Sequence, residues 1–217
     1  MSKTKIENSK APNPARDFEA AIDALRRGDV IVFPTETLYG LGADALNSEA
    51  VEKVFQLKGR DFRNPIPVLV AGPEMLRNLI SEISPLAQGL MDRFWPGPLT
   101  LVLPARQDLP KPLLNASGGI AVRISSQPIA TQVLKTLGRP LTATSANPSG
   151  EEPARTLQEA KSYFAGKVDF FLDGGRLTSK SGSTVVEVIG AAIKIIREGD
   201  ISTSELRSVV GAKIFQR

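Results

Sequence analysis

The stretch FPTETLYGLGADA, residues 33–45, decides the fold of this chain. It follows the apolar β-formers of residues 30–33, which predict a buried strand, and an amphipathic helix over 17–28 precedes that strand. Polar turn residues and two glycines then crowd one junction, where we expect no ordinary secondary structure. The glycines raise the question of whether this junction binds a nucleotide.

Gly40, Gly42 and Ala45 match the G-x-G-x-x-A pattern of dinucleotide-binding loops. In those loops the glycines open a helix directly, so that the helix N-terminus meets the pyrophosphate. Here the next helix is expected only at residues 48–60, with Ser48 as its N-cap, after a polar spacer. The match is therefore weak support for a dinucleotide, and the sequence contains no P-loop pattern.

Predicted helices and strands alternate for most of the remaining length, with an antiparallel pair of strands near the end. Further strands are expected at 66–71, 99–105, 119–125, 140–146, 169–175, 183–190 and 192–198, and further helices at 73–80, 85–95, 128–138, 157–165 and 204–210. This alternation predicts a single α/β domain with a twisted, mixed, largely central sheet flanked by helices. We place that domain at residues 17–217, behind a flexible basic tail at 1–16.

The composition excludes several kinds of chemistry. With no cysteine and no histidine, the chain has no disulfides, no Cys/His zinc site, no cysteine nucleophile and no Ser-His-Asp triad. It has neither a secretory signal nor an apolar run of about 18 residues, so we expect a cytoplasmic protein without a membrane span. The net charge of +4 is concentrated in the tail and indicates no particular partner.

Two segments carry candidate phosphate-binding groups. Lys58 continues the apolar stripe of its helix, where an unpaired ammonium is costly to bury, and Arg60 follows it. A cation near a helix C-terminus that reaches water is an equally good interpretation. Ser145 and Asn147 lie at the end of a predicted strand, where they suit either a phosphate or Mg²⁺ site or a plain turn. Strand arginines at 123 and 197 either converge with these groups or face solvent.

Taken together, the motifs resemble the YrdC/Sua5 family. They run in order as GDVIVFPTETLYGLGADA, KGR, FWPGPLTLVLP, IAVRIS, TATSANPSG, GSTVVEV and IIREG, over about residues 17–203. The specific part is the pair of signatures K-x-R, here Lys58 and Arg60, and S-x-N, here Ser145 and Asn147. The resemblance implies a short, single-domain threonylcarbamoyl-AMP synthase, which begins threonylcarbamoyladenosine modification of tRNA.

The resemblance also implies roles for individual residues around a deep cavity. Lys58 and Arg60 would be catalytic, and the tight turns allowed by Gly40 and Gly42 would shape the cavity mouth. The nucleotide and its phosphates would meet Lys58, Arg60, Ser145, Asn147 and Arg197, whereas threonine would meet Thr35, Tyr39, Arg123 and Ser183. Mg²⁺ would arrive with ATP, near Ser145 and Asn147, with no metal site assigned to side chains.

The implied substrates are ATP, L-threonine and bicarbonate, and the implied partners are downstream tRNA threonylcarbamoyl-transfer proteins, with weak direct tRNA binding. Two other functions stay open. One is a non-catalytic RNA-binding protein of the same fold, which the low aromatic content of 6% disfavours. The other is a carbamoyl-transfer enzyme, in which such a domain is part of a much larger chain. Because cations would crowd one cavity, we expect removal of Lys58 or Arg60 to leave stability without ligand unchanged or slightly higher.

Overall fold

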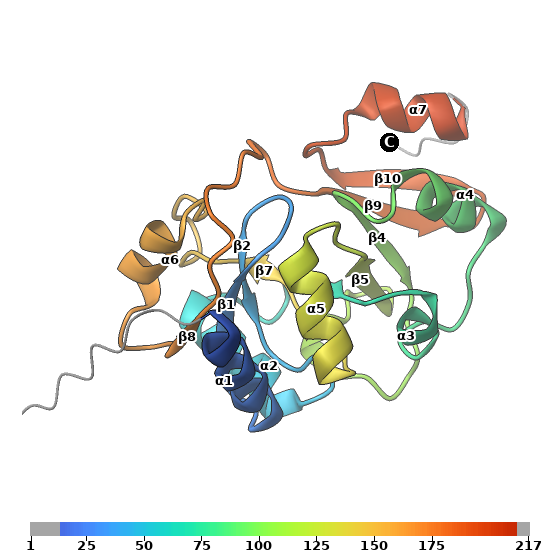
Figure 1. Cartoon of the computed structure of the whole chain (residues 1–217). Helices are drawn as coiled ribbons and strands as arrows, with labels where there is room; N and C mark the ends of the chain where they lie inside the picture. The colour runs from blue at the N-terminus through green and yellow to red at the C-terminus, as the bar shows by residue number, and fades with distance from the viewer. Residues whose placement is uncertain (1–13, 212–217) are drawn as a thin grey trace, which may run out of the picture.

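The computed structural model describes residues 14–211 and confirms a single α/β domain (Figure 1). The β-structure is divided into two sheets instead of one central sheet. A four-stranded sheet has the order β7-β2-β1-β8, and a six-stranded sheet has the order β10-β9-β4-β5-β3-β6. Both sheets are mixed, since each contains parallel and antiparallel pairs.

The elements follow the expected alternation along the chain. The strands are β1 (Ile31–Pro34), β2 (Tyr39–Gly42), β3 (Val68–Leu69), β4 (Leu99–Pro104), β5 (Gly119–Arg123), β6 (Leu141–Thr142), β7 (Thr144–Ser145), β8 (Phe170–Phe171), β9 (Thr184–Ile189) and β10 (Ala192–Arg197). The helices are α1 (Pro14–Arg26), α2 (Ser48–Lys58), α3 (Pro73–Arg77), α4 (Pro85–Phe94), α5 (Pro128–Leu137), α6 (Leu157–Phe164) and α7 (Thr203–Val210), with a 3₁₀ turn at Lys111–Leu113. Among the residues described, no helix is long and apolar enough to cross a membrane.

Helix α1 begins at Pro14, so the predicted tail boundary at residue 16 falls inside its first turn. The rest of the predicted tail, residues 1–13, lies outside the described residues. The apolar face of α1 packs with α5 and with Ile31 and Phe33 of β1 in one core cluster. These two helices therefore cover one face of the four-stranded sheet, as Figure 1 shows.

The stretch at 33–45 contains regular structure that the sequence did not predict. Residues Tyr39–Gly42 form β2, which pairs antiparallel with β1, from Ile31 opposite Gly42 to Pro34 opposite Tyr39. The expectation of tight turns at Gly40 and Gly42 is wrong, because neither has a positive φ. A Cβ on Gly42 would instead lie 2.7 Å from the ring of Phe33 and 2.8 Å from Leu141. Gly42 is thus required by close packing of two elements.

Helix ends follow side-chain chemistry closely. The expectation that Ser48 is the N-cap of α2 is wrong. Asn47 is the N-cap, and its side chain accepts hydrogen bonds from the backbone amides of Glu49 and Ala50. Asparagine caps helices at least as well as serine, so one residue of displacement changes no packing. Gly59 ends the same helix in the left-handed conformation at φ 59°.

The chain crosses between the two sheets at three places, of which the first is the connection from β2 to β3 through α2. Ala143 alone separates β6 of the six-stranded sheet from β7 of the four-stranded sheet. The third crossing is the connection from β8 to β9, residues 172–183, which we call the strap; Figure 1 shows it in orange. The two sheets are therefore joined by three connections, with a space between them.

Candidate functional site

A pocket of about 610 Å³ lies between the two sheets. The four-stranded sheet and its loops contribute Thr35, Thr37, Tyr39 and Ser145, and the six-stranded sheet contributes Thr100, Arg123 and Arg197, among others. Seven of the nine predicted site residues line it: Thr35, Tyr39, Arg60, Arg123, Ser145, Ser183 and Arg197. Lys58 and Asn147 are not among its lining residues.

Lys58 ends α2 and is only 3% exposed, which confirms that it faces inward. Its ammonium donates to the carbonyl oxygens of Ser145, at 2.6 Å, and of Asn147, at 2.8 Å, and to Asn147 Oδ1 at 3.3 Å. Burial lowers the pKa of Lys58 to about 8, and the charge of Arg60 adds to this shift. All three donors of the ammonium are used within the protein, so Lys58 stabilises the S-x-N turn from the side that faces away from the pocket.

Asn147 is also committed to the turn that contains it. Its Nδ2 donates to the carbonyl oxygens of Pro148, at 3.0 Å, and Glu151, at 2.6 Å, while its Oδ1 faces Lys58. The backbone amide of Ser149 donates in turn to the carbonyl oxygen of Lys58, at 2.8 Å. K-x-R and S-x-N are thus brought together, and only Arg60 and Ser145 of the four residues reach the pocket.

Arg60 organises the loop that leads from α2 to β3. Its Nε donates to the carbonyl oxygen of Asn64, at 2.7 Å, and its Nη2 to that of Pro65, at 3.2 Å. Asn64 and Pro65 also line the pocket, so the loop wraps around the guanidinium and presents it there. Burial lowers the pKa of Arg60, and the like charge of Arg197 lowers it further.

Arg197 and Ser183 form a linked pair at another wall of the pocket. The guanidinium of Arg197 donates to the carbonyl oxygen of Ser183, at 2.8 Å from Nη2, and to its Oγ at 3.2 Å. Thr100 Oγ1 donates to the same Oγ at 2.9 Å. Because Ser183 Oγ receives two donors and has no acceptor for its own proton within residues 14–211, that proton can serve a ligand.

A bulge in β10 allows two neighbouring side chains to face this pocket. The register of β10 against β9 shifts between Ile195 and Arg197. In a regular strand successive side chains point to opposite faces, whereas here both Ile196 and Arg197 line the pocket. Ile196 is 52% exposed and supplies an apolar surface beside the charge.

Arg123 is almost completely buried and holds an ion pair that sequence reasoning missed. Its Nη1 lies 2.8 Å from Glu36 Oε1 and 3.2 Å from Thr37 Oγ1. The other oxygen of Glu36 accepts from the hydroxyl of Ser125. Burial lowers the pKa of Arg123, with Glu36 opposing the shift. Glu36 and Thr37 stand inside the PTET motif, which was the available signal for them.

The hydroxyls of Thr35 and Tyr39 have internal partners. Thr35 Oγ1 donates to the carbonyl oxygen of Leu38, at 2.7 Å, and closes the turn between β1 and β2. The Tyr39 hydroxyl donates to the carbonyl oxygen of Gly175 and accepts from the amide of Gly174. Burial raises the pKa of Tyr39 to about 12. Both residues line the pocket, but their hydroxyls mainly hold loops in place.

The pocket is suited to an anion. Three guanidinium groups, of Arg60, Arg123 and Arg197, line it, and no acidic side chain is among the described residues that do so. Glu36 neutralises the charge of Arg123 from outside the lining, which leaves the charges of Arg60 and Arg197 for an anion. Within residues 14–211 there is also no cluster of three acidic residues that could hold a metal ion. With Asn147 Oδ1 facing a lysine, a Mg²⁺ ion here would take most of its oxygen ligands from a bound phosphate and from water.

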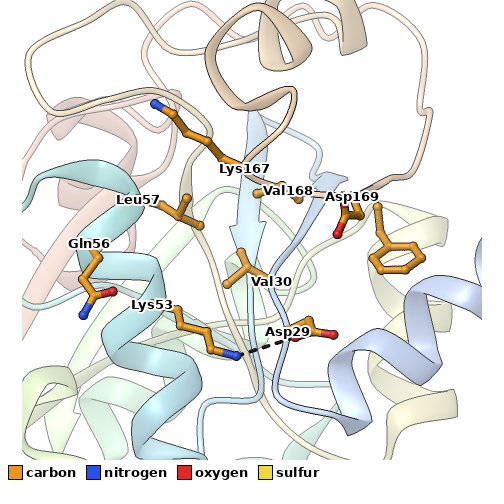
Figure 2. Close-up of a pocket in the computed structure, with 9 residues that line it drawn as sticks. Asp29, Val30, Lys53, Gln56, Leu57, Lys167, Val168 and Asp169 are labelled. Atoms are coloured by element: carbon orange, nitrogen blue, oxygen red, sulfur yellow. Dashed lines mark ion pairs between the residues drawn. The ribbon is translucent and has the colours of Figure 1, made fainter. Parts of the chain in front are cut away.

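A second pocket, of about 390 Å³, lies at the other end of β1 and contains none of the predicted site residues. Figure 2 shows Val30 and Leu57 within it, with Lys53 and Asp29 pointing toward one another. Lys53 Nζ lies 3.6 Å from Asp29, and Lys167 and Asp169 add one further charge of each sign. Because these charges balance, this pocket has no comparable attraction for an anion.

The fold and the sequence both have known relatives. The Sua5/YciO/YrdC family model, described as telomere recombination, matches residues 23–199. The threonylcarbamoyl-AMP synthase of Pyrococcus abyssi is 37% identical over 187 residues, which are 86% of this chain and 55% of that protein. The threonylcarbamoyl-AMP synthase of Thiobacillus denitrificans is 36% identical over 173 residues, covering 80% of this chain and 90% of the relative.

Among solved structures, that of P. abyssi Sua5 complexed with L-threonine matches with a TM-score of 0.88 and 34% identity, over 95% of this chain and 61% of that chain. This chain thus spans a little over half of the Pyrococcus relative and most of the Thiobacillus one. The family match covers most of the residues described, including both sheets and the pocket between them. On these grounds the chain belongs to the Sua5/YciO/YrdC family.

Proposed function

We propose that this chain is a threonylcarbamoyl-AMP synthase, which makes threonylcarbamoyl-AMP and pyrophosphate from L-threonine, bicarbonate and ATP. The observation that carries the proposal is the pocket lined by Arg60, Arg123 and Arg197 without an acidic side chain. All three substrates bring negative charge, and relatives that are 36–37% identical carry this activity in their names.

The proposed reaction asks the protein for positioning and charge stabilisation. Bicarbonate and the amine of threonine form an N-carboxy compound with loss of water, and its carboxylate oxygen attacks the α-phosphorus of ATP. The bond from that phosphorus to the bridging oxygen breaks, and pyrophosphate leaves. Such a transfer needs no covalent nucleophile from the protein, which agrees with a chain that has neither cysteine nor histidine.

We assign the phosphates to Arg60, Arg197 and Ser145, which share the pocket. A guanidinium binds phosphate oxygens with a planar pair of donors, and its attraction increases as charge moves toward the leaving pyrophosphate. Mg²⁺, when bound with ATP, would supply further neutralisation of phosphate charge. Of the two residues expected to be catalytic, Arg60 therefore keeps that role, and Lys58 acts through the turn that presents Ser145.

We assign the amino acid to the wall formed by Arg123, Thr35, Thr37 and Ser183. The charge of Arg123 is paired with Glu36, so we assign to the ligand the remaining donors of its guanidinium together with the free proton of the Ser183 hydroxyl, which lines the same pocket and suits a carboxylate or a hydroxyl group. Tyr39 supports this wall by holding the start of the strap. The Pyrococcus Sua5 structure with bound L-threonine, which has the same fold, supports threonine as the substrate.

The RNA-binding alternative is less well supported. The only aromatic residue among the described lining residues is Tyr39, which is fully buried with its hydroxyl on the strap, so it offers no base-stacking surface. We propose that the product passes to tRNA threonylcarbamoyl-transfer proteins in the cytoplasm, and that direct contact with tRNA is weak.

The test is release of pyrophosphate from ATP by the purified chain with Mg²⁺. We expect release that requires both threonine and bicarbonate, and a threonylcarbamoyl-AMP product in mass spectrometry. Serine, which lacks the methyl group, is the matched control for the amino-acid site. Pyrophosphate release that is independent of threonine, or none under any condition, would overturn the proposal.

A further inference from the structure

The two ends of the strap are tied to the sheets. At its start, Tyr39 holds Gly174 and Gly175 through its hydroxyl, at 2.9 Å and 2.8 Å. At its end, the guanidinium of Arg197 donates to the carbonyl oxygen of Ser183. The backbone amide of Asp200 donates to the carbonyl oxygen of Gly182 at 2.8 Å. Ser181 and Ser183, near this second end, line the pocket.

Leu177 in the middle of the strap is buried in the core, and the hydrogen bonds that tie this part of the strap to other segments depend on one residue. The carbonyl oxygen of Arg155 accepts from the amide of Leu177 at 2.8 Å. Its guanidinium donates from Nε to the carbonyl oxygen of Ser179, at 2.9 Å, and from Nη2 to that of Lys180, at 3.0 Å. Apart from the bond from the amide of Gly182 to Ser179 Oγ, which lies within the strap, every hydrogen bond between residues 176–180 and the rest of the described chain involves Arg155.

Arg155 is itself fixed in place. Its backbone amide donates to the carboxylate of Glu159 at 2.6 Å, beside the capping box that opens α6. Ala154, next to it, accepts from the amide of Tyr39 in β2 at 3.0 Å. The guanidinium thus extends from a rigid helix start toward two successive carbonyl groups, a geometry that the planar fork of arginine fits and the single ammonium of lysine does not.

We propose that Arg155 is a positioning residue that holds the strap closed over the pocket and so fixes Ser181 and Ser183 where a ligand meets them. Its kinetic consequence rests on the proposed function, whereas its structural consequence does not. Without the guanidinium, the carbonyl groups of Ser179 and Lys180 lose their partners, and residues 176–180 keep only one hydrogen bond to the body of the protein.

Limited trypsin digestion tests the structural part, because Lys180 is itself a trypsin site within the strap. Wild type, Arg155→Met, Arg155→Lys and the exposed control Arg26→Met are digested without ligand, and mass spectrometry follows the fragment that begins at Ser181. We expect cleavage after Lys180 to be about tenfold faster or more in Arg155→Met, since charge-assisted hydrogen bonds of this kind are lost. Arg155→Lys should be intermediate, and Arg26→Met should match wild type.

Steady-state kinetics test the consequence for the pocket. In Arg155→Met we expect KM for threonine to rise about tenfold or more while kcat changes by less than about threefold, because a displaced Ser183 weakens binding more than it alters chemistry. Threonine with ATP should slow cleavage after Lys180 in the wild type. Arg155→Lys should recover part of the change in KM.

The outcomes separate the two proposals. If the wild type releases no pyrophosphate, the proposed function fails, and the trypsin comparison still decides the role of Arg155. Equal cleavage after Lys180 in Arg155→Met and wild type overturns the inference. It is also overturned if cleavage rises equally at sites throughout the chain with a lowered melting temperature and an unchanged KM, since Arg155 would then stabilise the fold only.

Discussion

The ammonium nitrogen of Lys58 lies 2.6 Å from the carbonyl oxygen of Ser145, so the lysine of K-x-R is joined to the serine of S-x-N through the backbone. The contact gives a physical reason for the pairing of the two motifs. The lysine shapes the turn, and the serine of that turn lines the pocket. We had expected that removing Lys58 would leave stability unchanged or higher. Because the ammonium of Lys58 has three oxygen partners, we now expect its removal to lower stability.

Lys58→Met is expected to destabilise the protein by about 2–4 kcal/mol, since it leaves buried oxygen atoms of Ser145 and Asn147 without a donor. Urea unfolding at pH 7 measures this change. Lys53→Met, on the exposed side of the same helix, is the control, with an expected change below about 1 kcal/mol. Equal stability of Lys58→Met and wild type would contradict the bracing role.

The stability difference between wild type and Lys58→Met should also depend on pH. The pKa of Lys58 is about 8 in the folded protein and 10.5 in the reference state, so the unfolded chain binds more protons between these values. Raising the pH from about 8 to 10.5 therefore favours the folded wild type, by up to about 1.4 kcal/mol per pH unit. A difference that stays flat across this range in paired urea titrations would argue against the lowered pKa.

Arg60→Met is expected to lower the rate of pyrophosphate release about 30- to 1,000-fold, because it removes a charge-assisted contact to phosphate in the transition state. The matched control is Arg63→Met in the same loop, whose side chain is 88% exposed and forms an ion pair with Asp61. This control should retain activity within about threefold. Comparable losses in both variants would show that loop structure, not the Arg60 charge, is what matters.

Glu36→Ala is expected to destabilise the protein by about 3–5 kcal/mol, because it leaves the buried guanidinium of Arg123 without its carboxylate. Glu36→Gln keeps an acceptor for Arg123, so its stability should lie between that of the wild type and that of Glu36→Ala. Asp23→Ala, which breaks the exposed ion pair with Arg26, should change stability by less than about 1 kcal/mol. Chemical denaturation of the three variants in parallel makes the comparison.

Gly42→Ala is expected to lower stability by about 1–3 kcal/mol, since its Cβ would overlap Phe33 and Leu141 in the core. Gly89→Ala is the matched control, because Gly89 lies in the exposed interior of α4 with open space where a Cβ would be. That variant should gain up to about 1 kcal/mol from helix propensity. Melting temperatures that move in the same direction for both would contradict the packing explanation.

Local signals predicted the fold well where they were strong. The inward stripe that ends at Lys58 and the helix expected at 157–165 appear in the structure as expected, because each depends on neighbours within one or two helical turns. The resemblance selected Arg60, Arg123 and Arg197 for one site, and the structure brings all three to the same pocket. Their convergence depends on sheet order, which spacing along the chain does not encode.

The missed features are contacts between distant segments. Gly42 is required by Phe33 and Leu141, of which Leu141 lies far along the chain, so its role could not be told from that of a turn glycine. The ion pair of Glu36 with Arg123 joins a turn to a strand of the other sheet. The division into two sheets could not be predicted from the sequence either, because it depends on β6 pairing with β3 while β7 pairs with β2.

Ala143 is the single residue between β6 and β7, and it keeps the two walls of the pocket close together at this edge. A one-residue link permits little relative movement of the two sheets at that edge, so any adjustment in pocket width must be largest at the far edge, where Arg197 and the strap lie. A bound anion near Arg60 and Arg197 offsets the repulsion between their like charges. A bound anion would then hold the two walls together at the far edge, and its charge would influence the distance between Arg60 and Arg197.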